Sequence, residues 1–300
     1  MEKRFESSFS VKERIIAGRY RLERLLGEGA SGRVYLARDT KERGAVWAIK
    51  ELDYTALPLT EVQEARLLFA REAELLKKLS HPSLPAVVDS FQIEDRDYLV
   101  MERVEGPTLE KILADRPEPL PEARVWAIGL GLLKTLDYLH RRNPPVIYRD
   151  LKPANVMVAR SGEVKLVDFG IARVVAPQKV GDTTAYGTPG YAPPEQYQGR
   201  TSPASDIYAL GMTLLRAATL YEPPQFKFAH PPAVELNSGL SAALAETLDS
   251  MVAKDAEARP GTGRLIPFFE AACEFSPSGA EFTILLRKSW RKLKKLWNRG

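Results

Sequence analysis

One stretch constrains the fold of this chain more than any other: residues 148–170, YRDLKPANVMVARSGEVKLVDFG. Short valine-rich runs on both sides of Ser161 and Gly162 predict a tight β-hairpin. A hairpin brings its ends together, so we expect Asn155 and Asp168 to meet there and offer two oxygen ligands, which suits Mg²⁺ beside phosphates. The stretch holds four groups suited to handling a phosphate: Asp150, Lys152, Asn155 and Asp168. The alternative is an ordinary charged surface loop.

A second motif lies near the N-terminus, where Gly27, Gly29 and Gly32 follow the pattern GxGxxG. Alternate positions before and after the glycines are mostly apolar, which predicts two strands joined by them; these positions are Tyr20, Leu22, Arg24, Leu26, Val34 and Leu36. Alone the motif is weak evidence for any one function, because the dinucleotide-binding fingerprint has the same glycine spacing. That fingerprint differs in running from a strand into a helix. The strand AVWAIK follows and ends at Lys50, which by itself would be a surface lysine.

Residues 60–79 predict a helix, with Thr60 and Gln63 fitting a capping box. Helical periodicity places Glu72 on an apolar face and Glu74 toward water. The apolar neighbours of Glu72 are Leu68, Phe69, Leu75, Leu76 and Leu79. Because a carboxylate in an apolar stripe is costly unless it is paired, Glu72 needs a cationic partner.

Further elements are expected downstream. Two strands are predicted over residues 86–93 and 98–104, with a turn at residues 94–96, followed by a long helix over residues 121–142.

Together these motifs resemble those of the eukaryotic-type (Hanks-type) serine/threonine protein kinases, in a bacterial-like form. Residues 148–170 are similar to the family's H-R-D-x-K-x-x-N and D-F-G motifs, with Tyr148 where His is usual. That position is expected to pack rather than react. The segment GTPGYAPPE at 187–195 resembles the end of the activation segment. Three later landmarks also match, so that the resemblance covers about residues 19–270: Asp206, Gly211 and Arg259 with Pro260. The resemblance implies that Arg259 pairs with Glu195.

The resemblance implies an α+β, two-lobed protein kinase fold, with a small β-rich N-lobe carrying one main helix and a larger, mainly helical C-lobe. The domains expected are an N-terminal extension over residues 1–18, the N-lobe over 19–104, the C-lobe over 105–275 and a basic amphipathic tail over 276–300.

The resemblance also implies ATP and Mg²⁺. Asp150 would orient the attacking hydroxyl, Lys152 would stabilise the transferring phosphoryl group, and Asn155 and Asp168 would hold the metal. Lys50, paired with Glu72, would bind the α- and β-phosphates. Met101 would be the gatekeeper and Glu102 to Val104 the hinge. The implied nucleotide-binding residues are Leu26, Gly27, Glu28, Gly29, Ala30, Ser31, Gly32, Arg33, Val34, Ala48, Lys50, Glu72, Met101, Glu102, Val104 and Met157.

The implied function is transfer of the ATP γ-phosphate to serine or threonine of proteins, since Lys152 and Thr188 follow the serine/threonine pattern. Arg149 before Asp150 is typical of kinases switched by phosphorylation, and Thr183 or Thr184 would accept it, including from the chain itself; the alternative is that both are merely polar loop residues. Two rival functions are a pseudokinase scaffold and a small-molecule phosphotransferase.

Substrate preference is indicated at three positions. Arginine-directed relatives carry acidic residues where this chain has Ala154, Gly190 and Arg216. The resemblance therefore predicts no requirement for arginine before the phosphorylated residue.

The charge of the chain is uneven. The formal net charge is +4, but residues 287–300 carry seven Lys or Arg and no acid, which leaves −3 for the rest. Five apolar residues of the 282–299 tail recur at helical spacing, so the tail could pack on the lobe, lie on anionic lipid or bind a partner; no specific nucleic acid is expected. One cysteine, no signal peptide and no run long enough to span a membrane predict a cytoplasmic protein, with attachment at the inner face of the membrane left open.

Overall fold

The computed structural model describes residues 14–29, 32–54, 57–168, 187–224 and 228–274. These residues form two compact units: an N-lobe of residues 14–80 and 85–104, and a C-lobe of residues 81–84 and 105–274, each with the gaps just given. Several predicted sites lie outside the described residues, namely Ala30, Ser31, Thr183, Thr184 and the 282–299 tail. No helix of the described residues is both long and apolar enough to cross a membrane.

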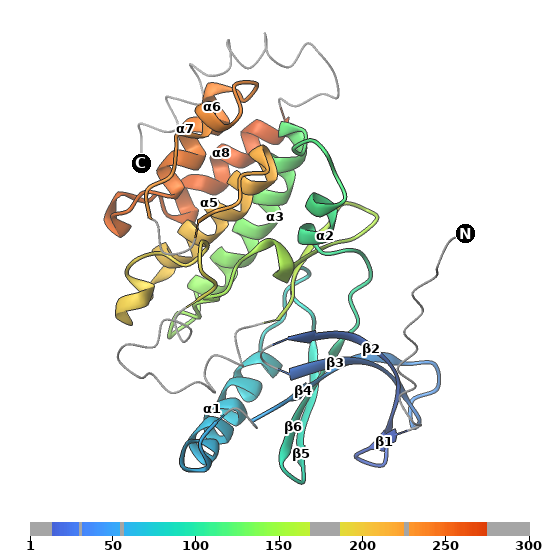
Figure 1. Cartoon of the computed structure of the whole chain (residues 1–300). Coiled ribbons are helices and arrows are strands. Elements are labelled where there is room, and N and C mark those ends of the chain that lie inside the picture. Colours follow the sequence, from blue (N-terminus) through green and yellow to red (C-terminus); the bar gives the residue numbers. More distant parts are fainter. Residues whose placement is uncertain (1–13, 30–31, 55–56, 169–186, 225–227, 275–300) are drawn as a thin grey trace, which may run out of the picture. The chain divides into compact units, whose positions relative to one another are not determined.

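A six-stranded antiparallel sheet forms most of the N-lobe (Figure 1). Along the chain its strands are β1 (Arg14–Ile16), β2 (Tyr20–Gly29), β3 (Gly32–Asp39), β4 (Val46–Leu52), β5 (Val87–Ile93) and β6 (Arg96–Glu102). Their order in the sheet is β1-β2-β3-β4-β6-β5. The sheet therefore includes residues 14–16, which lie within the segment expected to be an N-terminal extension.

The glycine motif joins two strands, as the sequence predicts. β2 and β3 pair with Gly29 opposite Gly32, so the chain turns from strand to strand and the dinucleotide-binding alternative is excluded. Irregularities after Leu22 and after Leu25 shift the register of β2. Since a bulge changes the face on which later residues lie, the alternation fails at Leu26, whose exposed fraction is 40%.

The main helix of the N-lobe is α1 (Leu59–Lys77), which packs against β5. The predicted capping box is wrong: Pro58 is the N-cap, Thr60 already lies in the first turn, and no side chain of the described residues caps it. The Pro58 carbonyl instead accepts the Glu61 N–H at 2.9 Å. The apolar face is narrower than predicted, because Leu75 is 40% exposed.

The β5–β6 hairpin turns more tightly than predicted. Ile93 pairs with Arg96, so only Glu94 and Asp95 form the turn, and Arg96 belongs to β6. A stack of three rings from β2, β5 and β6 fills the sheet's core: the Tyr20 and Phe91 ring centroids are 5.8 Å apart, and those of Phe91 and Tyr98 5.4 Å apart.

A buried carboxylate joins three strands of the same sheet. Glu51 on β4 is 2% exposed and accepts hydrogen bonds from the Tyr98 hydroxyl at 2.8 Å, from Arg14 at 3.1 Å and from Arg96. Because a buried charge must be paired, these donors bind edge strand β1 to β4 and β6.

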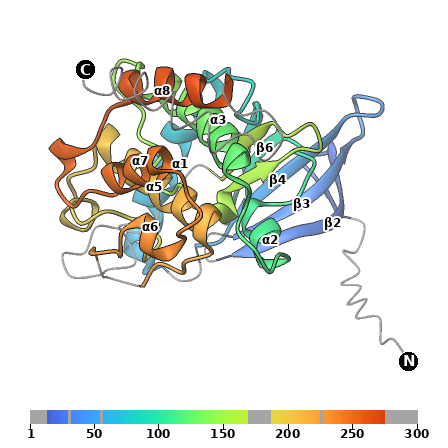
Figure 2. The ribbon, with the colours of Figure 1, turned by 90° about the horizontal axis from the view of Figure 1, so that it is seen from above.

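Helices dominate the C-lobe: α2 (Leu109–Ala114), α3 (Glu122–His140), α5 (Pro203–Thr219), α6 (Ala233–Leu236), α7 (Ala242–Met251) and α8 (Thr262–Glu274). Within this lobe α3 packs against α5 and α8, and α5 also packs against α7 (Figure 2). The long helix predicted over residues 121–142 is confirmed as α3. Its Trp126 ring lies edge-on to Phe269, with centroids 4.7 Å apart.

The central hairpin is confirmed. β7 (Val156–Val158) pairs antiparallel with β8 (Val164–Leu166), and Gly162 turns the chain with φ 94°. The Val167 N–H donates to the Asn155 carbonyl at 2.9 Å. The ends of the hairpin therefore meet next to Asp168, as expected. Together the two lobes confirm the predicted α+β, two-lobed organisation.

Candidate active site

Asp206 on α5 fixes the start of the loop that carries the candidate catalytic residues. This fully buried carboxylate accepts the Tyr148 N–H at 2.9 Å and the Arg149 N–H at 2.8 Å. His140, the last residue of α3, places its Nε2 2.8 Å from the same carboxylate. One side chain therefore joins two helices of the C-lobe to the loop before Asp150.

Tyr148 packs and does not face the reacting groups. It is 2% exposed, and its hydroxyl donates to the Val167 carbonyl at 2.5 Å. The tyrosine thus links the catalytic loop to the chain before Asp168.

The Asp150 carboxylate is the centre of the site. Thr188 Oγ1 donates to its Oδ1 at 2.8 Å, and Asn155 Nδ2 donates to its Oδ2 at 3.1 Å. Lys152 Nζ lies 3.3 Å from Oδ2 and donates to Thr188 Oγ1 at 2.8 Å. A carboxylate held in one orientation beside an ammonium group can accept a hydrogen bond from a hydroxyl and aim it.

Asn155 and Asp168, the predicted metal ligands, follow from the hairpin geometry. Asn155 ends the short 3₁₀ helix η1 (Pro153–Asn155) and is 5% exposed. Its amide nitrogen donates to Asp150, so the amide oxygen is the atom that would bind a metal. Asp168 is half-buried and has φ 63°, a left-handed conformation uncommon outside glycine and found often at functional sites.

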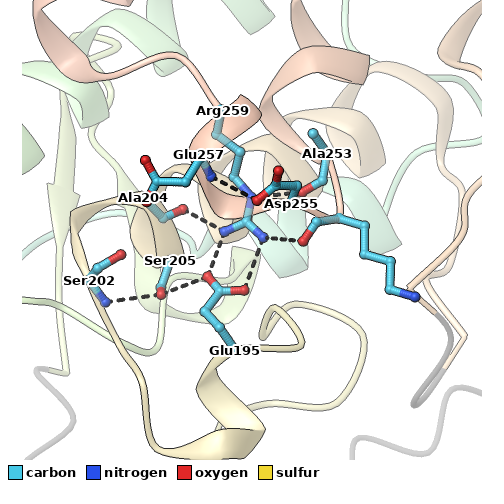
Figure 3. Close-up of polar contacts among 9 residues, drawn as sticks. Glu195, Ser202, Ala204, Ser205, Ala253, Asp255, Glu257 and Arg259 are labelled. Carbon is cyan, nitrogen blue, oxygen red and sulfur yellow. Dashed lines mark hydrogen bonds and ion pairs between the residues drawn. The ribbon is translucent and has the colours of Figure 1, made fainter.

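An ion pair anchors the segment that carries Thr188 (Figure 3). Arg259 and Glu195 form a bidentate ion pair, with Nη1 2.6 Å from Oε1 and Nη2 3.0 Å from Oε2. Ser205 Oγ donates to the same carboxylate at 2.9 Å. Burial tends to raise the pKa of Glu195, but the hydrogen bonds from Arg259, the backbone and Ser205, together with the charge of Arg259, outweigh burial and hold the pKa below its ordinary value. The pairing predicted from the sequence is therefore present.

Arg216 on α5 forms a second bidentate ion pair, with Glu110. Its Nη1 is 2.5 Å from Glu110 Oε2, and its Nη2 is 2.9 Å from Glu110 Oε1 and 2.5 Å from Glu222 Oε1. Nη1 also donates to the Tyr191 hydroxyl at 3.0 Å, whose pKa burial raises to about 12. Tyr191 lies three residues after Thr188, and its N–H donates to the Thr188 carbonyl.

In the N-lobe, Lys50 is buried rather than superficial. It lies on β4 between Val34 of β3 and Leu99 of β6, and it is only 3% exposed. Glu72 is half-buried on α1, with its Oε2 atom fully buried. Glu74, in contrast, points to water and pairs with Lys77 at 2.8 Å, as periodicity predicts.

The glycines of the loop differ in what they require. A side chain on Gly32, which has φ 125°, would meet the Glu51 carbonyl, so the backbone itself requires glycine there. A Cβ on Gly27 or Gly29 would meet no described atom within 4 Å, so the space beside them is open for a ligand. Glu28 and Arg33, the predicted residues on either side of the turn, form an ion pair at 2.8 Å.

The remaining predicted nucleotide-binding residues lie on strands or at their ends. Ala48 pairs with Met101 across β4 and β6. The Glu102 N–H donates to the Ala86 carbonyl at 2.8 Å, so a bond from Glu102 to adenine would come from its carbonyl. Val104 follows β6 and is half-buried. In the C-lobe, Met157 is half-buried on β7, opposite Lys165.

The sequence matches the family model described as protein kinase domain over residues 20–267. The chain belongs to this family. A probable serine/threonine-protein kinase of Streptomyces coelicolor is 38% identical over 218 residues, which is 70% of this chain and 31% of that protein. A probable serine/threonine-protein kinase, PknB, of Lactococcus lactis is 33% identical over 82% of this chain and 40% of its own length. This chain thus spans less than half the length of these curated relatives.

Solved structures share the fold. The PknI kinase domain of Mycobacterium tuberculosis superposes with a TM-score of 0.69 at 29% identity, over 87% of this chain and 97% of that one. A structure described as the apo form of PpkA-294 has a TM-score of 0.72 at 28% identity, over 83% and 96%. The predicted two-lobed protein kinase fold is confirmed.

The donor set of this kinase domain fits Mg²⁺ held partly by phosphate. Among the described residues no three His, Cys, Asp or Glu side chains are placed to hold a metal together. Mg²⁺ usually keeps several waters and takes only one or two carboxylates besides substrate oxygens. An amide oxygen of Asn155 and the Asp168 carboxylate fit that requirement.

Sequence reasoning missed three contacts within this kinase domain. His140 and Gln196 bond to the catalytic loop or to the carboxylate behind it, and Glu110 binds Arg216 from 106 residues away. The spacing of apolar residues shows only which face of a helix or strand points inward. It could therefore mark these residues as inward-facing, but it could not identify the residues that they contact.

Proposed function

We propose that this protein kinase domain transfers the γ-phosphoryl group of ATP to serine or threonine hydroxyls of proteins. The hydrogen-bonded set of Asp150, Lys152 and Thr188 carries the proposal, because it places a carboxylate acceptor and an ammonium group at one point. The bacterial relatives are named serine/threonine-protein kinases, which supports the same substrate class.

In the proposed reaction, the substrate hydroxyl donates a hydrogen bond to Asp150 and is thereby aimed at the γ-phosphorus. A new oxygen–phosphorus bond forms as the bond to the ADP oxygen breaks, and the hydroxyl proton passes to Asp150. Lys152 places a positive charge beside the transferring group, where charge is spread over three oxygens. Thr188, bonded to both side chains, keeps them aligned.

Each lobe, taken by itself, offers groups that suit a nucleotide. In the N-lobe, Lys50, held by Glu72, would contact the α- and β-phosphates, and the open space at Gly27 and Gly29 would admit phosphate. In the C-lobe, Asn155 and Asp168 would hold Mg²⁺, which neutralises phosphate charge when bound.

A variant of Asp150 tests the enzyme proposal. Label transfer from γ-labelled ATP to the chain and to a generic protein is measured for the wild type and for Asp150→Asn, which keeps the shape of the side chain. Loss of the aiming acceptor is expected to lower the rate by about 10²-fold or more. Asp115→Asn, at an exposed carboxylate after α2, is the matched control. Absence of transfer by the wild type and Asp150→Asn alike would leave a pseudokinase scaffold.

The rival small-molecule phosphotransferase is weakened by the Glu195–Arg259 pair. Relatives of that kind generally lack both the GTPGYAPPE block and this pairing, whereas both are present here. Transfer to a generic protein, against transfer to choline or an aminoglycoside only, separates the two functions.

Activity is proposed to rise when Thr183 or Thr184 is phosphorylated, by the chain itself or by another kinase. Arg149, next to Asp150, could bind the added phosphate through two parallel hydrogen bonds. The double change Thr183→Ala and Thr184→Ala is expected to lower activity and the amount of phosphate that the chain incorporates. Unchanged values for both would remove the switch.

The basic tail is proposed to bind a membrane surface or a partner groove. Its apolar residues at helical spacing and its seven cationic residues suit anionic lipid. Co-sedimentation with anionic and with neutral vesicles, for the chain with and without residues 280–300, separates the outcomes. Binding that needs both the tail and anionic lipid supports the membrane, and no binding favours a partner or packing on the lobe.

A further inference from the structure

Gln196 lies behind the catalytic pair of Asp150 and Thr188. It begins the 3₁₀ helix η3 (Gln196–Gln198), directly after the anchored Glu195, and is 4% exposed. Its Nε2 donates to the Arg149 carbonyl at 2.9 Å. A buried amide therefore contacts the backbone of the residue before Asp150.

The same amide also lies against the residue before Thr188. A Cβ built on Gly187 would lie 2.6 Å from Gln196 Nε2, and Gly187 has φ 144°, so no other residue fits this position. Gln196 thus contacts Arg149 and Gly187, each of which directly precedes one partner of the Thr188–Asp150 hydrogen bond.

Arg149 is the part of the loop that most needs support. Its φ of 70° is a left-handed conformation that non-glycine residues rarely adopt. Asp206 accepts its N–H at 2.8 Å, and Gln196 donates to its carbonyl. Both polar groups of this strained residue are therefore bound by buried side chains from outside the loop.

We infer that Gln196 is a positioning residue for the phosphoryl-transfer reaction: by binding the Arg149 carbonyl and packing on Gly187, it sets the distance between Asp150 and Thr188. The inference rests on the proposed kinase function. In the proposed reaction Gln196 touches neither the nucleotide phosphates nor the attacking hydroxyl, so it acts on the rate of transfer and leaves ATP binding unchanged.

The chemistry of the side chain supplies the test. Only a donor can bond to the Arg149 carbonyl, because a carboxylate would face that oxygen with like partial charge. Gln196→Glu keeps the shape and loses the donor while it is ionised. When it is protonated, it gains an O–H that can donate to the same carbonyl. Burial raises the pKa of a carboxyl group, so this protonation is expected at moderately acidic pH.

Six titratable groups on neighbouring elements also face this region: Glu195 with Arg259, Asp206 with His140, and Asp150 with Lys152. Each is present in the wild type as well. The quantity to follow is therefore the ratio of variant kcat to wild-type kcat over roughly pH 5 to 9, a range chosen to contain the raised carboxyl pKa.

At neutral pH we expect Gln196→Glu to lower kcat by about 100-fold, the lower end of what a positioned proton acceptor usually contributes. The KM for ATP should stay within about twofold, since uniform binding is untouched. The kcat ratio should rise toward one as the pH falls. Gln196→Met, similar in volume and without a donor, should lose kcat equally at every pH.

Gln198→Glu is the matched control, since it makes the same chemical change two residues away on the exposed face of η3. Wild-type kcat for Gln196→Glu at neutral pH, or equal losses for the Glu and Met variants at every pH, would overturn the inference. If the Glu variant does not fold, a folded Gln196→Met with wild-type kcat overturns it, and one with reduced kcat and unchanged KM supports it. Failure of the kinase proposal is distinguishable, because Asp150→Asn and the wild type would then be equally inactive.

Discussion

Arg259 and Arg216 both place a forked guanidinium on a glutamate of the C-lobe, and their remaining contacts differ. Arg259 donates to Glu195 and also to three backbone carbonyls, of Ala204, Ala253 and Lys254, at 2.9, 2.7 and 3.1 Å (Figure 3). Its side chain is 0% exposed and that of Glu195 is 13% exposed. All three nitrogens of the Arg259 guanidinium therefore donate to the Glu195 carboxylate or to backbone carbonyls, whose positions the fold fixes.

Arg216 binds partners that are more exposed to solvent. Its side chain is 11% exposed, but those of Glu110 and Glu222 are 40% and 72% exposed. The three charged side chains sum to −1, and the Tyr191 hydroxyl links them to the segment of Thr188. A carboxylate that faces water can change partner at little cost, whereas one enclosed by the fold cannot.

The difference indicates that the two arginine–glutamate ion pairs have different roles. The Arg259 pair stabilises the end of the segment 187–195, on which the placement of Thr188 depends. We propose that the Arg216 cluster, which is more exposed and bonded to Tyr191 of the same segment, responds to the charge of a substrate.

The largest effect is expected from breaking the enclosed pair. Arg259→Met leaves the Glu195 carboxylate buried without its cation, which should lower the free energy of unfolding by about 3 to 5 kcal/mol. The urea midpoint of unfolding measures the loss. The double variant Arg259→Met with Glu195→Met removes both charges and should recover much of it. A single variant as stable as the double one would show that the pair is not enclosed as described.

The enclosed pair should also respond to acid. The pKa of Glu195 is lower in the folded chain than its ordinary value of 4.5, so the unfolded chain binds more protons near that pH. The stabilisation is therefore complete above pH 4.5 and is lost as the pH falls through the lowered pKa. The stability advantage of the wild type over Glu195→Gln, measured by urea unfolding, should shrink below pH 4.5. An advantage that grew on acidification would contradict the direction of the shift.

Local signals in the sequence predicted much of this arrangement. The valine-rich runs around Gly162 gave the β7–β8 hairpin, and apolar periodicity chose Glu72 over Glu74 as the inward carboxylate. Resemblance to the kinase family named the Glu195–Arg259 pair. In each case the information lies within a few residues or in a motif of fixed spacing.

Contacts between distant segments could not be predicted in this way. The two irregularities in β2 turned Leu26 toward water, although alternation placed it with Leu22. Arg216 was singled out as a departure from the family, but its bond to Glu110 crosses 106 residues. No sequence motif marks Gln196, and its importance comes only from the backbone groups that folding places next to it.

A change in Arg216 should alter substrate choice more than stability. Arg216→Gln leaves Glu110 and Glu222 as two neighbouring carboxylates without a cation, which should attract basic residues of a substrate. Given the proposed kinase function, kcat/KM for a peptide with arginine before the serine should rise about 10-fold relative to a glutamate peptide, a difference of about 1.4 kcal/mol. The wild type should show no arginine requirement. A strong arginine preference in the wild type would refute the proposed role of the cluster.

The smallest effect is expected at the exposed end of the same cluster. Glu222→Gln removes one of the two carboxylates of Arg216, and the other remains bound in a fork. Because Glu222 is 72% exposed, the free energy of unfolding should change by at most about 0.5 kcal/mol, as for exposed ion pairs in general. Lys77→Gln, which breaks the exposed pair with Glu74 on α1, is the control and should give a change of the same size. A loss of more than about 2 kcal/mol in Glu222→Gln alone would mean that the cluster is as rigid as the Arg259 pair, and the contrast between the two arginines would fail.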